Sequence, residues 1–450
     1  MRNQTSEDIA RAKAVRSNLA NFMIALIAAE GGIALGIGVL AQSASDWSDP
    51  GLAITALSRI AAMAGTYLAL VCLVLVARIP WLEKEFGQDV LVKLHRKFAP
   101  YSLYLIVIHV IFVSLGYGLL GDLNIWNQFW SLVLGTPWMM PAFFGYIFMM
   151  MVGITSYKRA RSRMKYDTWY LLHLYAYLGI GLSFAHTITS GIMFVDNDVM
   201  RYWWIALYVL VVIFILGFRV IYPLARTLRH DIRVEKIVRE SPHTVSVIMK
   251  GRNLDKLNAR GGQFFTWRFL DHTSGWEGHP YSLSASPTDS RLRITVKSLG
   301  DHSKSLANLT PDSRVMVEGP YGVFTADKIE GKTALLIAGG VGITPIRALL
   351  EELPLDVETD LIWRASSEKD LSLRDEVEEI AKKRGTRIHY MVGSRKHFPL
   401  NESRLKRTIP HILETDIFLC GPEGMVEEAR ESILELGVDP DRLHDEAFAY

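Results

Sequence analysis

The chain has 450 residues, of which 50% are hydrophobic, and its formal net charge is +2. This balance lacks the basic excess typical of nucleic-acid binding. Its two cysteines, Cys72 and Cys420, lie far apart, which excludes a disulfide framework and a cysteine-rich zinc site. Long apolar runs crowd the part before residue 226, so we expect a membrane domain followed by soluble domains.

Residues 1–18 are polar and charged, and the apolar stretch after them lacks a small-residue cleavage site. We interpret that stretch as a first membrane span and not as a removable signal. Crossing about 30 Å of hydrocarbon takes about 20 apolar residues in a helix. The segments that meet this requirement are residues 19–41, 53–76, 97–119, 137–155, 169–189 and 203–224.

The loops between these predicted spans alternate in positive charge. Residues 77–97 and 156–166 each carry five lysines or arginines, whereas 42–52 and 119–136 carry none and 190–202 has only Arg201. The positive-inside rule therefore predicts a multi-pass protein of the plasma or inner (cytoplasmic) membrane, with both termini in the cytosol.

The membrane half contains two histidine pairs, His95 and His109 on the third predicted span and His173 and His186 on the fifth. The spacings of 14 and 13 residues correspond to about 20 Å along each helix. Because both spans run outward, His95 can face His173 near the inner surface and His109 can face His186 near the outer one. Ionisable residues in a bilayer are costly and usually functional.

Two imidazoles on opposite sides of a gap are what a six-coordinate haem iron needs. We therefore predict two stacked b-type haems. Histidines hydrogen-bonded within the bundle are the alternative, whereas other metals lack a carboxylate or thiolate beside the histidines. A 13-residue step leaves the second pair about 140° out of phase on an ideal helix. We expect a local distortion there, permitted by Gly179 and Gly181.

Arg59 falls in the outer half of the second predicted span. An arginine at that depth needs a partner, and a haem propionate or the approaching electron acceptor is a natural one. The alternative is an arginine whose side chain extends to the membrane interface.

Residues 231–326 show short alternating strands with Gly and Pro turns, which indicate a small antiparallel barrel. Within this part, the run from His279 to Ser284 places a tyrosine where it can lie flat on an isoalloxazine ring, with Ser282 near the flavin N5. The run from Val296 to Ser303 contains a glycine that lets backbone amides approach a diphosphate. Either run alone could be a barrel turn, but together they favour a flavin site formed by His279, Pro280, Tyr281, Ser282, Lys297, Gly300 and Ser303.

From Lys332 onward, apolar strands alternate with helical stretches, as in a parallel α/β sheet. One strand leads into a glycine-rich turn and a helix N-terminus, which can bind a pyrophosphate. A purely structural turn is the alternative. The candidate residues of this turn are Gly340, Gly342, Thr344 and Pro345.

Another predicted strand ends in Cys420, Gly421 and Pro422, at the sheet edge where ligands bind. Cys420 could contact a nicotinamide or be a small buried apolar residue. Arg364, Ser366 and Arg395 follow later strands and could bind a 2′-phosphate, which modestly favours NADPH over NADH.

Several features occur along the chain in the order found in one known family: the six spans, the paired histidines, HPYSLS, GPYG at Gly319–Gly322, GGVGITP and CGPEGM. By these features the sequence resembles the ferric reductase/NADPH oxidase superfamily, in the compact form of a bacterial NADPH oxidase. The resemblance implies a six-helix transmembrane bundle followed by a ferredoxin-reductase-like module. We expect a cytosolic N-terminal segment (residues 1–18), a di-haem domain (19–226), an FAD-binding β-barrel (227–328) and an NAD(P)H-binding α/β domain (329–450).

The resemblance also implies roles for single residues. His95 and His173 would bind the inner haem, and His109 and His186 the outer one. Arg59 is similar to a family arginine beside the outer haem and the oxygen site. Tyr281 and Ser282 would contact FAD, while Gly340, Gly342, Thr344 and Pro345 would contact NADPH. The family commonly stacks an aromatic residue of the C-terminal tail on the flavin, for which the candidates are Phe448 and Tyr450.

The expected activity is electron transfer from cytosolic NADPH, through FAD and two haems, to dioxygen on the opposite face, giving superoxide. A ferric or cupric reductase with the same path is the alternative, as is a module that supplies electrons to a partner protein or quinone. A non-catalytic haem sensor is disfavoured by the flavin and nicotinamide runs. The sequence has no EF-hand or Pro-rich partner segment, so we expect no obligate protein activator.

Overall fold

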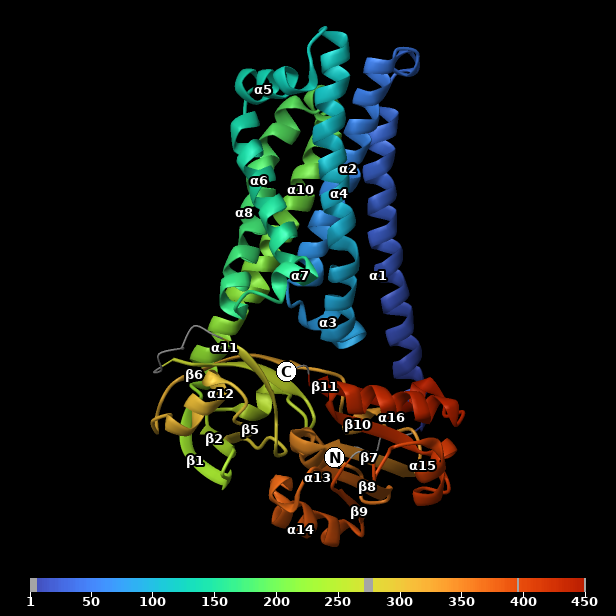
Figure 1. Ribbon diagram of the computed structural model, residues 1–450, viewed down its shortest axis with the longest axis vertical. Coiled ribbons are helices and arrows are strands. Elements are labelled where there is room, and N and C mark those ends of the chain that lie inside the picture. Colours follow the sequence, from blue (N-terminus) through green and yellow to red (C-terminus); the bar gives the residue numbers. More distant parts are fainter. Residues whose placement is uncertain (1–5, 271–277, 395, 449–450) are drawn as a thin grey trace. The chain divides into compact units, whose positions relative to one another are not determined.

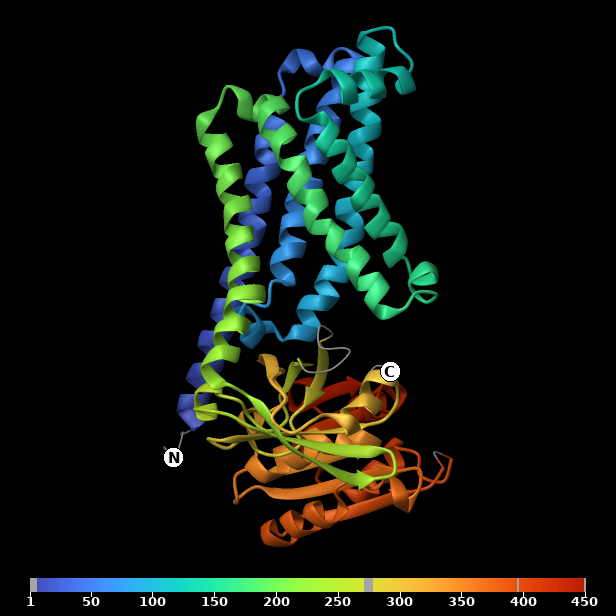
Figure 2. The same ribbon diagram turned by 90° about the vertical axis from the view of Figure 1, so that its left-hand side faces the viewer.

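The computed structural model describes residues 6–270, 278–394 and 396–448. The chain divides into two compact units between Val220 and Ile221 (Figures 1 and 2). The first unit is helical, and the second combines strands and helices.

Six of the described helices are long and apolar enough to cross a membrane, as the sequence predicts. They are α1 (Ser6–Leu40), α2 (Pro50–Leu75), α4 (Gln88–Leu120), α6 (Met139–Ser156), α8 (Tyr166–Ser190) and α10 (Asp198–Ile215). After α10, a π-helical turn (Leu216–Ile221) leads into α11 (Tyr222–His230). Shorter helices connect them: η1 (Ala44–Trp47), α3 (Pro80–Phe86), α5 (Ile125–Gly135), α7 (Lys158–Arg161) and α9 (Ile192–Val195).

Helix α4 begins at Gln88, nine residues before the expected start of its span, so His95 and His109 lie on one continuous helix. It packs along α2, where the Ser102 hydroxyl donates to the carbonyl oxygen of Gly65 at 2.7 Å. Hydroxyl-to-carbonyl bonds between spans stabilise close helix packing in a bilayer.

The prediction of a distortion in α8 is wrong, because this segment is a regular α-helix from Tyr166 to Ser190. The ring contact between His173 and His95 of α4 forms without such a distortion. Gly179 has another role. A side-chain carbon there would lie 2.9 Å from the carbonyl oxygen of Gly145 on α6, so its absence lets the two helices pack closely.

In the second unit, the strands up to residue 321 form two antiparallel three-stranded sheets. One has the order β1 (Arg233–Ser241), β2 (Thr244–Lys250), β5 (Arg291–Lys297), and the other β4 (His279–Ser282), β3 (Phe264–Phe269), β6 (Val315–Tyr321). Both sheets contribute to one core, which includes Val247, Ile294, Phe265 and Trp267. Alternating apolar residues of the predicted barrel strands therefore face a shared interior.

The rest of the unit is a parallel five-stranded sheet in the order β11-β10-β7-β8-β9. Helices α13 (Ile343–Glu352) and α14 (Arg374–Arg384) pack on one face, and α15 (Glu402–Thr408) and α16 (Glu423–Glu435) on the other. The strands are β7 (Thr333–Gly339), β8 (Glu358–Ala365), β9 (Arg387–Val392), β10 (Asp416–Pro422) and β11 (Leu443–Phe448). The strand order reverses between β7 and β10, which is where such sheets bind ligands.

Candidate functional site

The first histidine pair lies where α4 and α8 approach each other. The ring centroids of His95 and His173 are 6.0 Å apart, and the ring planes are inclined by 67°. The His95 Nδ1 atom lies 3.1 Å from the Cys72 carbonyl oxygen of α2, and the His173 Nδ1 atom lies 3.2 Å from the Ser156 hydroxyl. Neighbouring helices thus orient both rings.

The second pair contributes to the lining of a cavity of about 340 Å³. His109 of α4 and His186 of α8 both contribute to its wall. The His109 Nδ1 atom is 3.1 Å from the Ser58 carbonyl oxygen and 2.9 Å from its hydroxyl, while the His186 Nδ1 atom is 2.6 Å from the Ser183 carbonyl oxygen. A volume of this size lies within the range of about 300–1,000 Å³ that ligand pockets occupy.

These contacts fit a pair of haem-ligating imidazoles. In three of the four histidines, Nδ1 lies against a backbone carbonyl, to which it can only donate. The proton therefore sits on Nδ1, and the Nε2 lone pair is left for a metal. The separation of the His95 and His173 rings also suits an iron between them, since two metal–nitrogen bonds of about 2 Å plus half of each ring add to about 6 Å.

Among the described residues, no group of three or more His, Cys, Asp or Glu side chains is placed to hold a metal ion. Each histidine pair supplies two nitrogen donors, which is the number of axial ligands that a six-coordinate haem iron with two protein ligands requires.

Arg59 lines the same cavity as His109 and is half-buried. Its guanidinium donates to the Gln42 side-chain oxygen at 3.1 Å and to the Tyr117 hydroxyl at 3.3 Å. Both partners are neutral, so these contacts hold the cation at the cavity wall without neutralising its charge.

The HPYSLS run forms β4 and the residues after it. The Tyr281 hydroxyl lies 3.1 Å from Nδ1 of His302, and the His302 ring stacks on His279 with centroids 3.5 Å apart. Burial raises the pKa of the Tyr281 phenol, which therefore keeps its proton. Within β4, Pro280 is exposed, Ser282 is buried, and His279 and Tyr281 are half-buried.

Two residues of the predicted diphosphate loop are engaged within the protein. The Ser303 hydroxyl accepts from the backbone amides of Leu299 and Gly300, which orders the loop ahead of α12 (Asp301–Ser305). Lys297 donates to Asp370 at 3.0 Å. Both side chains therefore stabilise the surroundings of the loop in this structure.

The two nucleotide-binding runs meet at the switch point of the parallel sheet. Ala338 of β7 pairs with Cys420 of β10, so the turns after both strands emerge side by side. Gly340 has a φ of +54°, which favours glycine. A side-chain carbon on Gly342 would overlap the Cys420 carbonyl oxygen. Thr344 and Pro345 lie in the first turn of α13, whose N-terminal amides favour an anion.

Other nucleotide-site candidates differ in exposure. Cys420 is fully buried in the core beneath α13, as expected for the alternative of a small buried apolar residue, and burial raises its thiol pKa well above the usual value. Arg364 is buried within β8, and does not follow the strand as expected, which removes it from the exposed edge. Ser366, just after β8, is exposed, as a phosphate contact requires. Gly421 is buried and Pro422 half-buried at the end of β10.

The tail runs as β11 beside β10, with the Phe448 backbone opposite Pro422. This register brings the end of the tail to the ligand edge of the sheet. Arg395, Tyr450 and the Phe448 side chain lie outside the described residues.

Several residues of these sites escaped the sequence analysis, namely Ser58, Ser183, Gln42, Tyr117 and His302. A serine or glutamine within or next to an apolar span is a weak signal by itself. His302 follows Gly300 in the loop already singled out, and only the stacking with His279 shows its position.

Comparison with protein families matches three parts of the chain. Residues 61–184 match the ferric reductase like transmembrane component, residues 231–325 an FAD-binding domain and residues 336–431 an oxidoreductase NAD-binding domain. The chain is therefore a multi-pass membrane oxidoreductase with a ferredoxin-reductase-like FAD/NAD module. These domains, in this order, give the chain a ferric reductase/NADPH oxidase-like architecture, as its motifs suggested.

Two relatives each match about half of this chain or less. A glycine betaine monooxygenase reductase subunit of Chromohalobacter salexigens is 26% identical over 49% of this chain and 64% of its own length. A plasma membrane-associated coenzyme Q6 reductase of Saccharomyces cerevisiae is 30% identical over 34% of this chain and 54% of its own length. The chain thus spans less than two thirds of these relatives. The FAD/NAD-binding domain of a Vibrio cholerae nitric oxide dioxygenase covers 48% of this chain at 24% identity and a TM-score of 0.42, with 98% of that domain covered.

Proposed function

We propose that this protein carries electrons from NADPH, through FAD and two b-type haems, to dioxygen on the opposite face of the membrane, producing superoxide. The observation that carries the proposal is the arrangement of the four histidines. They form two pairs on α4 and α8, and carbonyl acceptors for Nδ1 leave Nε2 of His95, His109 and His186 available to iron.

In this proposal, His95 and His173 hold the inner haem and His109 and His186 the outer one. When bound, the flavin accepts a hydride and each haem iron exchanges one electron at a time. The protein keeps the two haem sites at fixed depths, about 21 Å apart along α4, because His95 and His109 are separated by 14 residues of one helix. Both termini then lie in the cytosol of a plasma or inner membrane, since the positively charged loops lie there.

Residues of the second unit bind the soluble substrate and the flavin. Tyr281, with its hydroxyl bonded to His302, presents a ring face to the isoalloxazine, and Ser282 lies beside it. The turn from Gly340 to Pro345 and the first amides of α13 bind the pyrophosphate of NADPH. NADH is an alternative, because Arg364 is buried and Ser366 is the exposed candidate for the 2′-phosphate.

The position of Arg59 favours an anionic or polarisable acceptor at the cavity that His109 lines. Its charge is held at the wall beside His109 by neutral partners, so it is available to attract a haem propionate or to stabilise superoxide as negative charge develops.

Reductase activity is the second candidate function. The transmembrane family is described as ferric reductase like, and the yeast relative is named a coenzyme Q6 reductase. A ferric or cupric chelate or a quinone would then replace dioxygen as acceptor, with the same electron path. A partner protein that receives the electrons is a further form of this alternative.

The test uses purified full-length protein in detergent with FAD. NADPH oxidation is followed in air with cytochrome c, with and without superoxide dismutase, and then anaerobically with a ferric chelate or a short-chain quinone. Cytochrome c reduction that superoxide dismutase abolishes supports the superoxide proposal. Anaerobic chelate or quinone reduction faster than the oxygen-dependent rate supports the reductase. Absence of a haem Soret band after growth with ample iron contradicts both.

A further inference from the structure

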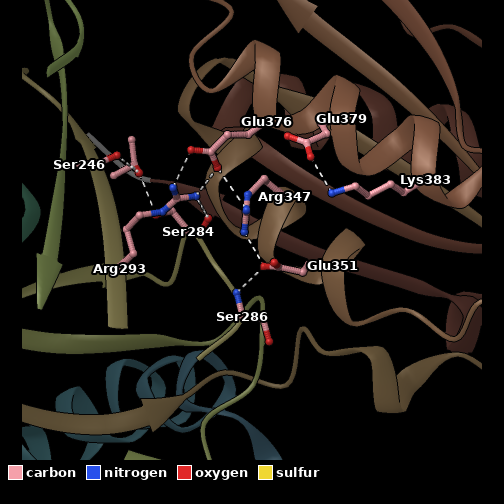
Figure 3. Close-up of polar contacts among 10 residues, drawn as sticks. Ser246, Ser284, Ser286, Arg293, Arg347, Glu351, Glu376, Glu379 and Lys383 are labelled. Atoms are coloured by element: carbon pink, nitrogen blue, oxygen red, sulfur yellow. Dashed lines mark hydrogen bonds and ion pairs between the residues drawn. The ribbon is translucent and has the colours of Figure 1, made fainter. Parts of the chain in front are cut away.

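Two arginines from different parts of the second unit converge on one carboxylate (Figure 3). Arg293 of β5 donates to both oxygens of Glu376 on α14, at 2.8 and 2.9 Å. Arg347 of α13 lies 3.1 Å from the same carboxylate. Glu376 therefore joins a strand of the flavin-type barrel to a helix of the parallel-sheet domain.

Arg293, Glu376 and Arg347 form a network, and Arg293, its member in the barrel, is bonded to the end of the HPYSLS run. Arg293 donates through Nε to the Ser284 hydroxyl at 3.1 Å and through Nη2 to the Ser284 carbonyl oxygen at 2.7 Å. Ser284, the last residue of that run, is fully buried and also accepts from the Thr295 hydroxyl. Arg293 thus holds the chain two residues after β4, the strand that carries Tyr281.

The other end is anchored to the helix that follows the glycine-rich turn. Glu351 of α13 pairs with Arg347 and accepts from the backbone amide of Ser286 at 2.8 Å. Glu352 accepts from the backbone amide of Gly261 at 2.7 Å. A side-chain carbon on Gly261 would overlap the Ala348 carbonyl oxygen, so the barrel backbone lies directly against α13.

We propose that Arg293, Glu376 and Arg347 are positioning residues that fix the flavin motif relative to the glycine-rich turn, and so align a bound nicotinamide with the flavin for hydride transfer. This inference rests on the proposed reduction of the flavin by NADPH. The three side chains act through the backbone segments that they hold together.

The physical basis is the geometry and burial of the contacts. The side chains of Arg293 and Arg347 are only 12% and 9% exposed, and the planar guanidinium of Arg293 makes a bidentate pair that fixes angle as well as distance. Another ion pair, Glu379 with Lys383, joins two residues of α14 (Figure 3), and their side chains are 66% and 70% exposed. Exposed ion pairs contribute little to stability, so the pair of Glu379 and Lys383 offers a matched control for Glu376.

The main experiment compares Glu376→Gln with Glu379→Gln in full-length protein in detergent, loaded with FAD. Anaerobic stopped-flow mixing with NADPH gives the limiting rate of flavin reduction and the apparent Kd for NADPH. Because a shift of about 1 Å in a reacting pair can slow a reaction by about a hundredfold, we expect Glu376→Gln to lower the limiting rate by about ten- to a hundredfold. The apparent Kd should change by less than about threefold, and Glu379→Gln should match the wild type.

A second readout needs no turnover. Hydrogen–deuterium exchange of the nucleotide-free protein reports the backbone amides of Ser286 and Gly261, which donate across the interface. Faster exchange at these amides in Glu376→Gln, with unchanged exchange in Glu379→Gln, supports a loosened interface. Equal exchange and a limiting rate within about twofold of wild type would overturn the proposal.

If Glu376→Gln does not retain FAD, Arg293→Lys is tested by the same two measurements. Lysine keeps the positive charge but loses the bidentate geometry, so a reduced limiting rate is again expected and an unchanged rate overturns the inference. Failure of the proposed function is distinguishable from failure of this inference, because in that case neither NADPH nor NADH reduces the flavin of the wild-type protein.

Discussion

The Ser58 carbonyl oxygen and the His109 Nδ1 atom lie 3.1 Å apart, and the Ser58 hydroxyl donates in turn to the His109 carbonyl oxygen at 2.9 Å. This reciprocal contact joins α2 to α4 beside the pair formed by His109 and His186. It fixes both the rotation of the imidazole and the nitrogen that carries the proton.

Ser58→Ala should weaken the outer haem site without unfolding the bundle. The hydroxyl that lies 2.9 Å from His109 Nδ1 is lost, while the backbone carbonyl remains. Changes to groups that orient metal ligands typically cost about ten- to a hundredfold in affinity or activity, so we expect about a tenfold loss in acceptor reduction or a shifted potential of one haem. Redox titration of the two haems measures this.

Ser102→Ala is the control, because it removes an equally buried hydroxyl bond between α4 and α2 that involves no histidine. Equal changes in both variants would mean that the Ser58 effect comes from helix packing alone.

His109→Leu should remove one of two haems. Its partner His186 cannot supply both axial ligands, whereas His95 and His173 remain paired. We expect the haem content to fall from about two per chain to about one, with acceptor reduction lost and flavin reduction by NADPH retained. A pyridine haemochrome assay and anaerobic flavin absorbance give these values, and two haems in the variant would refute the ligand assignment.

Gly179→Ala and Gly181→Ala should have opposite effects on stability. The added carbon at Gly179 would lie 2.9 Å from the Gly145 carbonyl oxygen, so α6 and α8 must move apart at a cost of about 1–3 kcal/mol. At Gly181 no described atom lies within 4 Å, and alanine should stabilise the helix by about 0.5–1 kcal/mol. Thermal unfolding in detergent measures both changes, and equal melting temperatures would contradict the close packing.

Asp360 should make the stability of the parallel sheet depend on pH. Burial alone would raise the pKa of its carboxyl, but hydrogen bonds and charges from Arg387 and His389 outweigh burial and hold the pKa below its usual value. This stabilisation is fully present above the usual aspartate pKa of about 3.9 and is lost as the pH falls through the lower pKa of the folded state.

Asp360→Asn should therefore cost about 1–2 kcal/mol near neutral pH, a modest value because the Arg387 side chain is 60% exposed. The difference from wild type should shrink as the pH falls below about 4. Chemical unfolding of both proteins between pH 6 and pH 3 tests this, and a constant difference would assign the effect to packing.

Much of the architecture could be predicted from the sequence. The spans are recognisable because a bilayer requires long uninterrupted apolar helices, and all six agree with described helices. The order of the barrel and the parallel sheet follows from strand periodicity, and the three family matches agree with it. The distortion expected in α8 was predicted wrongly, because the phase of two residues on one helix does not determine how a neighbouring helix approaches them.

What the sequence by itself determined is therefore local: which segments span the membrane, where the histidines, HPYSLS and the glycine-rich turn fall, and which superfamily these motifs define. The tertiary structure decided which groups meet, as in the contact of Ser58 with His109 and of Arg293 and Arg347 with Glu376, and that Cys420 and Arg364 are buried. The physical reason is that periodicity reports only the face on which a residue lies, whereas its partners depend on how helices and strands distant in the chain pack against one another.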